Sequence, residues 1–399
     1  MKRSLLHTLL TALLVAMAVS AFVSCHDDDG GRAKPIEGST TFIMYFPWSG
    51  NDIYPYFLKN IADMEKAVGH RQTVLTGKRL MVFISQSETT AVLFEVKQRG
   101  TVLVRDTLKK YISPVLNTAA GIHAIFGDIK AKAPSERYAM TIGSHGMGWL
   151  PPGARVDRLP QNRSCRIQRQ FPLTRYFGHG RFAAFQTEVK TLAEALRRAA
   201  MHMDFILFDD CYMANIETAY DLRKVADFLI ASTCEVMIEG VPYAMVGQNL
   251  LERDYGGVCR GFIDFYSAFF TPCGTLSVVD CREVEGMAEV MREINRRYVF
   301  DAAQYEGRLQ KLDGISPTIF YDFGDYVTNL CTDGALYERY RQQLARLVVH
   351  RVNTPTFYSV YNQVQTPILT FSGITISDPS LHPSAIEQKR QTAWHQATH

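Results

Sequence analysis

The sequence predicts an α/β protein built on a mostly parallel central sheet with helices on both faces. From about residue 41, short apolar runs alternate with amphipathic segments, as in repeated strand–helix–strand units. Such units join parallel strands through right-handed crossovers. The apolar runs predicted as buried strands are TFIMYF (41–46), LMVFIS (80–85), YAMTIG (138–143), FILF (205–208) and FLIAST (228–233).

Helices and one hairpin are expected between these runs. A helix follows the first strand, because its apolar residues recur at spacings of four, three and four. These residues are Phe57, Ile61, Met64 and Val68. Residues 90–96 and 101–108 predict an antiparallel hairpin at the sheet edge, and a helix is expected over 119–132. Before the fourth strand, Thr191 and Glu194 have the spacing of a helix capping box.

The pattern loosens after Asn249, and residues 250–399 are expected to form a smaller C-terminal α/β extension. This part contains a predicted strand at 276–280 and predicted helices near 262–270 and 336–349. Between them lies an amphipathic helix, whose apolar face comprises Val284, Met287, Met291, Ile294 and Tyr298.

The first 25 residues have the composition of a secretory signal. Lys2 and Arg3 precede a long apolar run, and the small residue before Cys25 resembles a bacterial lipobox. We therefore expect Cys25 to be lipidated and residues 26–39, which begin HDDDGG, to form a polar tether. An uncleaved membrane anchor is the alternative. The protein is expected to be exported to the outer membrane or cell surface by this lipid anchor, or released from it.

The net charge and the number of cysteines indicate which kinds of function are plausible for this protein. The net charge of +3 and the lack of a zinc-finger spacing or long basic stripe argue against a nucleic-acid partner. Seven of the eight cysteines lie beyond Cys25, and an odd number cannot all pair in disulfides. At least one thiol should be free, which suggests a reactive cysteine.

Residues 151–182 form a segment that differs from its surroundings. It is rich in arginine, contains several prolines and glycines, and lacks helical or strand periodicity. We expect an exposed loop. The plain alternative is a solvated basic insertion without a specific role.

Two reactive side chains come directly after predicted parallel strands. His145 follows the run at 138–143, and Cys211, 66 positions later, follows the run at 205–208. If these strands are neighbours, both side chains lie at the carboxyl edge of the sheet, where α/β proteins bind ligands. An imidazole can take the thiol proton and return it to a leaving group, and a helix starting after Cys211 would favour the thiolate. The N–H groups of Gly146 and Cys211 are expected to hold the oxyanion.

These segments resemble those of a known family. SHGMGW (144–149) and DFILFDDCYMANIE (204–217), in this order, resemble the His-Gly and Asp-x-Cys motifs of the clostripain family, cysteine peptidases with a caspase-like fold. The resemblance is good over about residues 40–250. The resemblance is weaker after residue 250, where the best-matching segments are FYDFGDYV (320–327) and FSGITI (371–376).

The resemblance implies a role for each matching residue within a peptidase domain at 40–399. His145 resembles the general base and Cys211 the nucleophile of a cysteine endopeptidase. Asp209 corresponds to the aspartate at the base of the specificity pocket, so the substrates are expected to be proteins or peptides with Arg or Lys at the cleavage site. Asp210, where the family commonly has a small residue, is the alternative pocket acid. For Asp209 the structural alternative is a helix N-cap or turn residue.

The resemblance also implies that the enzyme matures by cutting itself between the two motifs. The arginine-rich loop supplies suitable sites. The candidate cleavage sites are Arg155, Arg158, Arg163, Arg166 and Arg169.

Several alternatives stay open. Cys234 also follows an apolar strand and is the rival nucleophile, although it lacks the family motif. Ser144 is a weak candidate for a serine hydrolase, because IGSHG lacks the first glycine of a nucleophile elbow. A third alternative is a catalytically silent surface lipoprotein that binds peptide or glycan. No cofactor is expected to be required and no metal ligands are predicted; calcium is possible, but no acidic loop has EF-hand spacing.

Overall fold

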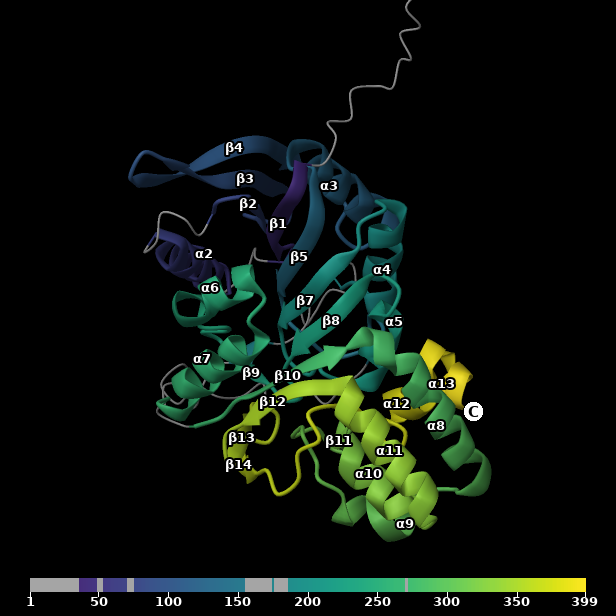
Figure 1. The fold of residues 1–399 in the computed structure, drawn as a ribbon. Helices are drawn as coiled ribbons and strands as arrows, with labels where there is room; N and C mark the ends of the chain where they lie inside the picture. Colours follow the sequence, from purple (N-terminus) through teal and green to yellow (C-terminus); the bar gives the residue numbers. More distant parts are fainter. Residues whose placement is uncertain (1–35, 49–52, 70–74, 155–173, 176–185, 270–271) are drawn as a thin grey trace, which may run out of the picture. The chain divides into compact units, whose positions relative to one another are not determined.

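The computed structural model describes residues 36–48, 53–69, 75–154, 174–175, 186–269 and 272–399 (Figure 1). Several predictions fall outside these ranges. They concern the signal peptide at 1–25 with Cys25, the tether up to residue 35, and the candidate cleavage sites Arg155, Arg158, Arg163, Arg166 and Arg169. Helix and strand labels are those of Figure 1.

A nine-stranded sheet lies at the centre of the described part of the chain. Its strand order is β12-β10-β8-β7-β5-β1-β2-β3-β4. Its strands are β1 (Ile36–Phe46), β2 (Lys78–Ser85), β3 (Thr90–Arg99), β4 (Val102–Ile112), β5 (Ser135–Gly143), β7 (Met203–Asp209), β8 (Ala226–Ala231), β10 (Thr275–Asp280) and β12 (Val348–Asn353).

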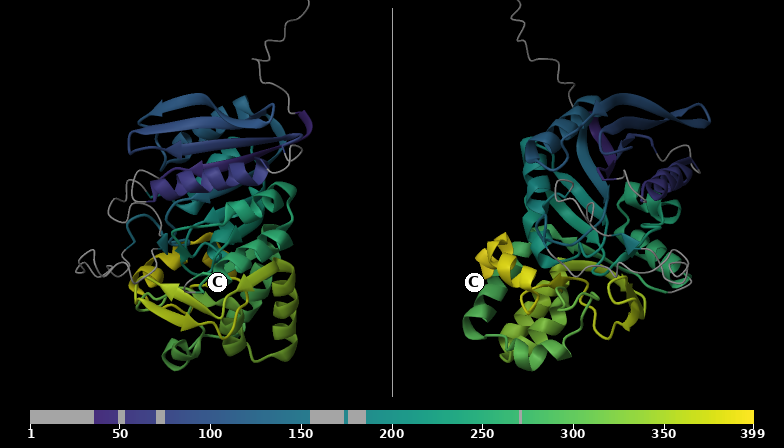
Figure 2. Two further views of the ribbon diagram at one scale, coloured as in Figure 1. Left: turned by 90° about the vertical axis from the view of Figure 1, so that its left-hand side faces the viewer. Right: turned by 180° about the vertical axis from the view of Figure 1, so that it is seen from behind.

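The middle of this sheet is parallel and its edges are antiparallel. β1 pairs in parallel with β2 and β5, and β7 pairs in parallel with β5 and β8. The hairpin β3–β4 adds to β2, and β10 followed by β12 adds to β8. In Figure 2 the blue hairpin and the yellow C-terminal elements accordingly lie at opposite ends of the sheet. The predicted α/β class and the edge hairpin are confirmed.

Helices cover both faces of the sheet. α2, α6 and α7 pack on one face, and α3, α4 and α5 on the other (Figure 1). None of the helices within the described ranges is both long and apolar enough to span a membrane. The helices are α2 (Tyr54–Gly69), α3 (Ala119–Lys132), α4 (Val189–Arg198), α5 (Ile216–Leu222), α6 (Tyr243–Glu252), α7 (Tyr255–Ser267), α8 (Val284–Arg297), α9 (Ala302–Tyr305), α10 (Phe323–Leu330), α11 (Gly334–Leu347), α12 (Pro383–Gln388) and α13 (Ala393–Thr398).

Strand β1 shows why the sheet needs cover on both sides. Its side chains point alternately to opposite faces. Phe42, Met44 and Phe46 pack in the apolar cluster with α2, α6 and α7, whereas Ile43 and Tyr45 join the cluster with α3, α4 and α5. The predicted apolar face of α2 is buried in the first of these clusters, which confirms the helical spacing read from the sequence.

The C-terminal residues continue the same fold. β10 and β12 extend the central sheet, and residues 35–399 group as one compact unit. The part at 250–399, expected as a smaller extension, therefore shares its sheet with the rest. It also holds short two-stranded sheets, β11 (Tyr321–Asp322) with β15 (Thr375–Ile376) and β13 (Thr356–Ser359) with β14 (Val364–Pro367).

Strand β1 begins earlier than the predicted end of the tether at residue 39. Ile36 already pairs with Ser135 of β5, and the N–H of Gly38 donates to the carboxylate of Glu136 at 2.8 Å. Backbone pairing with β5 thus orders four residues that look like linker by composition.

The predicted capping box at Thr191 and Glu194 is wrong. Helix α4 begins at Val189 with Glu188 as its N-cap residue, and the N–H of Thr191 already bonds the Glu188 carbonyl at 3.0 Å. Val189 is buried against the sheet, so its packing sets the start of the helix before the capping sequence is reached.

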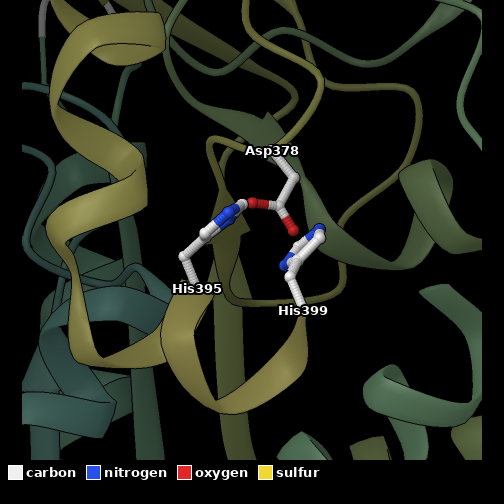
Figure 3. A group of neighbouring side chains, drawn as sticks. All are labelled: Asp378, His395 and His399. Atoms are coloured by element: carbon white, nitrogen blue, oxygen red, sulfur yellow. The ribbon is translucent and has the colours of Figure 1, made fainter. Parts of the chain in front are cut away.

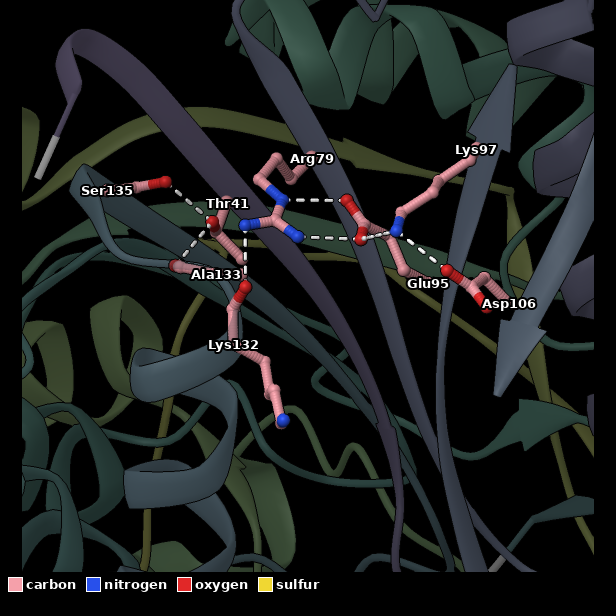
Figure 4. A network of polar contacts seen from close by, with 8 residues as sticks. All are labelled: Thr41, Arg79, Glu95, Lys97, Asp106, Lys132, Ala133 and Ser135. Carbon is pink, nitrogen blue, oxygen red and sulfur yellow. Dashed lines mark hydrogen bonds and ion pairs between the residues drawn. The ribbon is translucent and has the colours of Figure 1, made fainter. Parts of the chain in front are cut away.

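An ion-pair network supports the junction between β2 and the edge hairpin (Figure 4). Arg79 donates two hydrogen bonds of 2.6 Å to the carboxylate of Glu95 and one of 2.6 Å to the carbonyl of Lys132 at the end of α3. Lys97 lies 3.2 Å from Glu95 and 2.7 Å from Asp106 of β4. Only 4% of Glu95 is exposed, so its charge depends on these cations.

Candidate active site

Strands β5 and β7 are parallel neighbours, as predicted. Their last residues, Gly143 and Asp209, are register partners. The chain leaves both strands at this point, toward His145 on one side and Cys211 on the other. The prediction that these two residues follow adjacent strands is confirmed, and both lie at the carboxyl edge of the sheet.

Gly146 brings the two segments into direct contact. A Cβ atom at Gly146 would lie 2.2 Å from the carbonyl oxygen and 2.7 Å from the nitrogen of Cys211. Only a residue without a side chain fits this gap. The two N–H groups predicted to hold an oxyanion therefore belong to backbone segments that touch.

Asp210 fixes the turn that carries His145. Its carboxylate accepts a hydrogen bond from the N–H of Ser144 at 2.5 Å, and the Ser144 hydroxyl donates to the His145 carbonyl at 2.9 Å. Asp210 is fully buried and His145 is half-buried. These hydrogen bonds direct the Asp210 carboxylate toward the histidine turn.

Cys211 is fully buried in the turn between β7 and α5. Its Sγ accepts a hydrogen bond from the N–H of Val236 at 3.2 Å. The helix predicted after Cys211 is present, but α5 begins only at Ile216, where the N-cap residue Asn215 accepts from the Thr218 N–H at 2.7 Å. The Val236 amide, and not the N-terminus of α5, therefore donates to the sulfur and favours its thiolate form.

Tyr212, next to Cys211, has a left-handed backbone with φ 62°, which is uncommon for a bulky residue. Its hydroxyl donates to Glu235 at 2.7 Å, and its ring stacks on Phe320 with centroids 5.1 Å apart. These contacts hold the strained turn that presents Cys211. Sequence reasoning missed them, because no local pattern marks Glu235 or Phe320 as partners of Tyr212.

Asp209, the last residue of β7, is fully buried. Its carboxylate accepts hydrogen bonds from the N–H of Val241 at 2.9 Å and from the hydroxyl of Tyr243 at 3.2 Å. Asp209 therefore fixes the loop that leads into α6. It is not the N-cap of the following helix, since Asn215 has that role.

A piece of the arginine-rich loop pairs with the strand that contacts the sulfur. β6 (Thr174–Arg175) pairs antiparallel with β9 (Val236–Met237), so that Arg175 is the register partner of Val236. Val236 is also the residue whose N–H bonds Cys211. The backbone of the loop thus lines the strand that contacts the candidate nucleophile.

The model of the clostripain family, Peptidase_C11, matches residues 48–347. The chain belongs to the clostripain family. This match covers both the His145 and the Cys211 segments and confirms the resemblance read from the sequence. It makes the protein a cysteine peptidase, in preference to the silent binding lipoprotein considered as an alternative.

Solved structures agree with the clostripain assignment. A secreted C11 cysteine protease from Bacteroides thetaiotaomicron, "iotapain", is 44% identical, covers 92% of this chain and 100% of its own, and has a TM-score of 0.83. A clostripain from the same organism, in complex with the peptide inhibitor BTN-VLTK-AOMK, is 52% identical over 56% of this chain and 99% of its own, with a TM-score of 0.54. No curated protein matches the chain.

A third structure shares the fold at lower identity. An inactive zymogen C11 protease from Parabacteroides distasonis is 24% identical over 92% of this chain and 100% of its own, with a TM-score of 0.74. This likeness shows the shared α/β fold, whereas the support for peptide substrates comes from the family match.

Cys234 is a poor rival nucleophile in this clostripain-family site. Burial raises the pKa of its thiol to about 12, so very little thiolate forms at neutral pH. The other cysteines in the described ranges are also buried free thiols whose pKa is raised by burial. They are Cys259, Cys273, Cys281 and Cys331.

Proposed function

We propose that this clostripain-family chain is an endopeptidase that cuts after arginine or lysine through a dyad of His145 and Cys211. The contact of Gly146 with the backbone of Cys211 carries the proposal, because it sets the histidine turn beside the cysteine turn. The hydrogen bond from the Ser144 N–H to the Asp210 carboxylate supports the same geometry, since it joins the residues before the two dyad members.

In the proposed reaction, the imidazole of His145 takes the proton of Cys211, and the N–H of Val236 favours the resulting thiolate. The sulfur adds to the carbonyl carbon of the scissile bond, and the carbonyl π pair moves to the oxygen. The N–H groups of Gly146 and Cys211 stabilise this oxyanion. The C–N bond then breaks as His145 protonates the leaving amine, and water hydrolyses the thioester.

Asp209 is the proposed source of the preference for basic side chains. It is a fully buried carboxylate at the end of β7, two residues before Cys211, and its position is fixed by Val241 and Tyr243. A guanidinium or ammonium group would compensate its charge. The inhibitor in the clostripain from Bacteroides thetaiotaomicron, BTN-VLTK-AOMK, has lysine as the last residue of its peptide, in line with this preference.

Self-processing in the loop at 151–182 completes the proposal. Cys211 is fully covered and packs in an apolar cluster with Trp149 and Leu150, which directly precede the loop. The loop backbone of β6 also lies along β9. A cut within the loop would let the segments next to Cys211 and β9 move and open the site to other substrates.

The proposal also covers how the protein is exported and whether its activity needs a metal ion. We propose that residues 1–25 direct export and that Cys25 carries the lipid anchor; the related iotapain is described as a secreted protease. Thiolate–imidazole chemistry needs no metal at the dyad. A calcium chelator is therefore expected to leave peptide hydrolysis by the processed enzyme unchanged.

The proposal is tested with reporter peptides that carry arginine, lysine or aspartate before the cleaved bond. The wild-type chain should cut the first two and not the third, and Cys211→Ala should abolish cleavage. Cys234→Ser is the matched control and should retain activity. If Cys234→Ser were inactive and Cys211→Ala active, the dyad would be assigned wrongly.

The pocket and the loop are tested separately. Asp209→Asn should lower kcat/KM for arginine and lysine reporters without creating activity toward aspartate. Wild-type protein should appear as two pieces on a denaturing gel, whereas Cys211→Ala should stay a single chain. An active wild-type preparation that stays intact would contradict self-processing while leaving the dyad untouched.

A further inference from the structure

Three potential metal ligands meet away from the proposed active site (Figure 3). Asp378 follows strand β15, and His395 and His399 lie four positions apart at the last helix, α13. Residues at this spacing share one face of a helix. One ligand atom from each side chain lies within 4.8 Å of the other two, and Figure 3 shows the Asp378 carboxylate facing both imidazole rings.

The cluster contains buried polar atoms that protein groups do not satisfy. Within the described residues, neither Asp378 Oδ2 nor His395 Nδ1 has a hydrogen-bond partner, and both atoms are inaccessible to solvent. Buried polar atoms without a partner are rare, and each calls for a specific explanation. Here the two atoms belong to side chains that are common metal ligands and that face each other.

The donor set points to a particular class of ion. Two imidazoles and one carboxylate suit zinc and other first-row transition metals of similar softness, whereas calcium and magnesium prefer oxygen ligands.

We propose that Asp378, His395 and His399 bind one divalent transition-metal ion, with Zn²⁺ as the best fit, and that water completes the coordination. Ligand atoms around a tetrahedral zinc with bonds of about 2.0–2.1 Å lie about 3.3 Å apart. The cluster must therefore contract on binding. The rings of His395 and His399 stack with centroids 3.8 Å apart, so one ring must also turn to point its nitrogen at the ion. The short helix α13 ends at Thr398, so small shifts of His399 do not disturb a longer element.

Neighbouring groups shape this site. Asn295 of α8 lies 3.3 Å from Nε2 of His399, and the Thr398 hydroxyl lies 3.1 Å from Nδ1. The metal would replace one of these contacts, while the other would orient the ring. The ammonium of Lys389 donates to the Asp378 carbonyl at 2.5 Å, and its positive charge opposes a cation nearby. Lys389 therefore lowers the affinity of the site for the metal ion.

The bound ion would stabilise the packing of helix α13 against the rest of the protein. Trp394 of α13 packs edge-on against Tyr220 of α5, with ring centroids 5.7 Å apart. Ser377, next to Asp378, donates its N–H to Glu217 of α5 at 2.9 Å. Helix α5 follows the turn that carries Cys211. The proposed metal site would therefore stabilise the packing of the C-terminal residues against α5. It takes no part in the chemistry of the dyad.

The test uses the full chain, without a histidine tag, in a Cys211→Ala background, so that the dyad neither binds the metal nor cuts the chain. Zn²⁺ binding is measured by calorimetry, and Co²⁺ serves as a spectroscopic probe of tetrahedral nitrogen and oxygen ligation. We expect one equivalent of Zn²⁺, a higher Tm with Zn²⁺ than with a chelator, and no shift with Ca²⁺.

Substitutions separate this site from unspecific binding. His395→Gln and the more exposed His399→Gln should each weaken Zn²⁺ binding at least about tenfold, and Lys389→Gln should strengthen it. The matched control is His202→Gln, which removes an exposed histidine paired with Asp227 at 2.9 Å; it should change nothing. Absence of Zn²⁺ binding, or equal affinity in the control and in folded His399→Gln, overturns the proposal.

Discussion

The N–H of Ser144 donates a hydrogen bond of 2.5 Å to the carboxylate of Asp210. Each of these residues directly precedes one member of the proposed dyad. The hydrogen bond continues the register of β5 and β7, whose last paired residues are Gly143 and Asp209. The sheet thereby aligns the histidine and cysteine turns before any substrate is bound.

This relationship predicts that Asp210→Asn lowers kcat about tenfold with little change in KM, since loss of the charge-assisted hydrogen bond loosens the histidine turn. Steady-state kinetics on an arginine reporter measure both constants. Asp128→Asn, at a surface ion pair with Lys109, is the control and should leave both unchanged. A rise in KM alone would instead favour Asp210 as the pocket acid.

Gly146→Ala is expected to reduce kcat/KM by about a hundredfold or more, because the added Cβ would collide with the Cys211 carbonyl and push the two turns apart. Gly127→Ala in α3 is the matched control, since a Cβ there meets nothing within 4 Å. It should keep full activity and stabilise the fold slightly. Full activity of Gly146→Ala would show that the two turns need not touch.

Glu95→Ala is expected to destabilise the fold by about 1–3 kcal/mol, because it removes the charge-assisted hydrogen bonds of the partly exposed Arg79 and Lys97 to a buried carboxylate. Urea unfolding measures this loss. Asp63→Ala removes an ion pair with the exposed Lys59 on α2 and should cost no more than about 1 kcal/mol. If both substitutions lowered the unfolding free energy by similar amounts, the burial of Glu95 would not contribute to the strength of its ion pairs.

Asp313 predicts a pH dependence of stability. Burial raises the pKa of its carboxyl to about 7, although it accepts hydrogen bonds from the N–H groups of Ile315, Ile319 and Phe320. Between about pH 4 and 7 the folded state retains a proton that the unfolded state has lost, so this group's contribution falls as the pH rises.

Asp313→Asn removes that titration. Its deficit in unfolding free energy relative to wild type should therefore be larger at pH 5 than at pH 8, by an amount on the order of a few kcal/mol. Urea unfolding of both proteins at the two pH values provides the comparison. If the difference in unfolding free energy between wild type and Asp313→Asn grew with pH instead, the pH dependence assigned to Asp313 would be wrong.

Much of the fold was predictable, because strand and helix periodicity is a local property. The apolar run of β5, the hairpin β3–β4 and the face of α2 all matched their predictions. Boundaries were less predictable: β1 starts at Ile36 through pairing with β5, and α4 starts at Val189 through packing. Neither partner can be recognised from the segment itself.

The sequence by itself determined the two family motifs, the α/β alternation and the family, since these depend on residue types and spacings along the chain. Only the tertiary structure decided which groups surround the sulfur. Val236 donates to Cys211, Glu235 holds Tyr212, and Asp210 bonds Ser144. Each contact joins segments that are distant in sequence, and sheet register, which no local pattern encodes, brings them together.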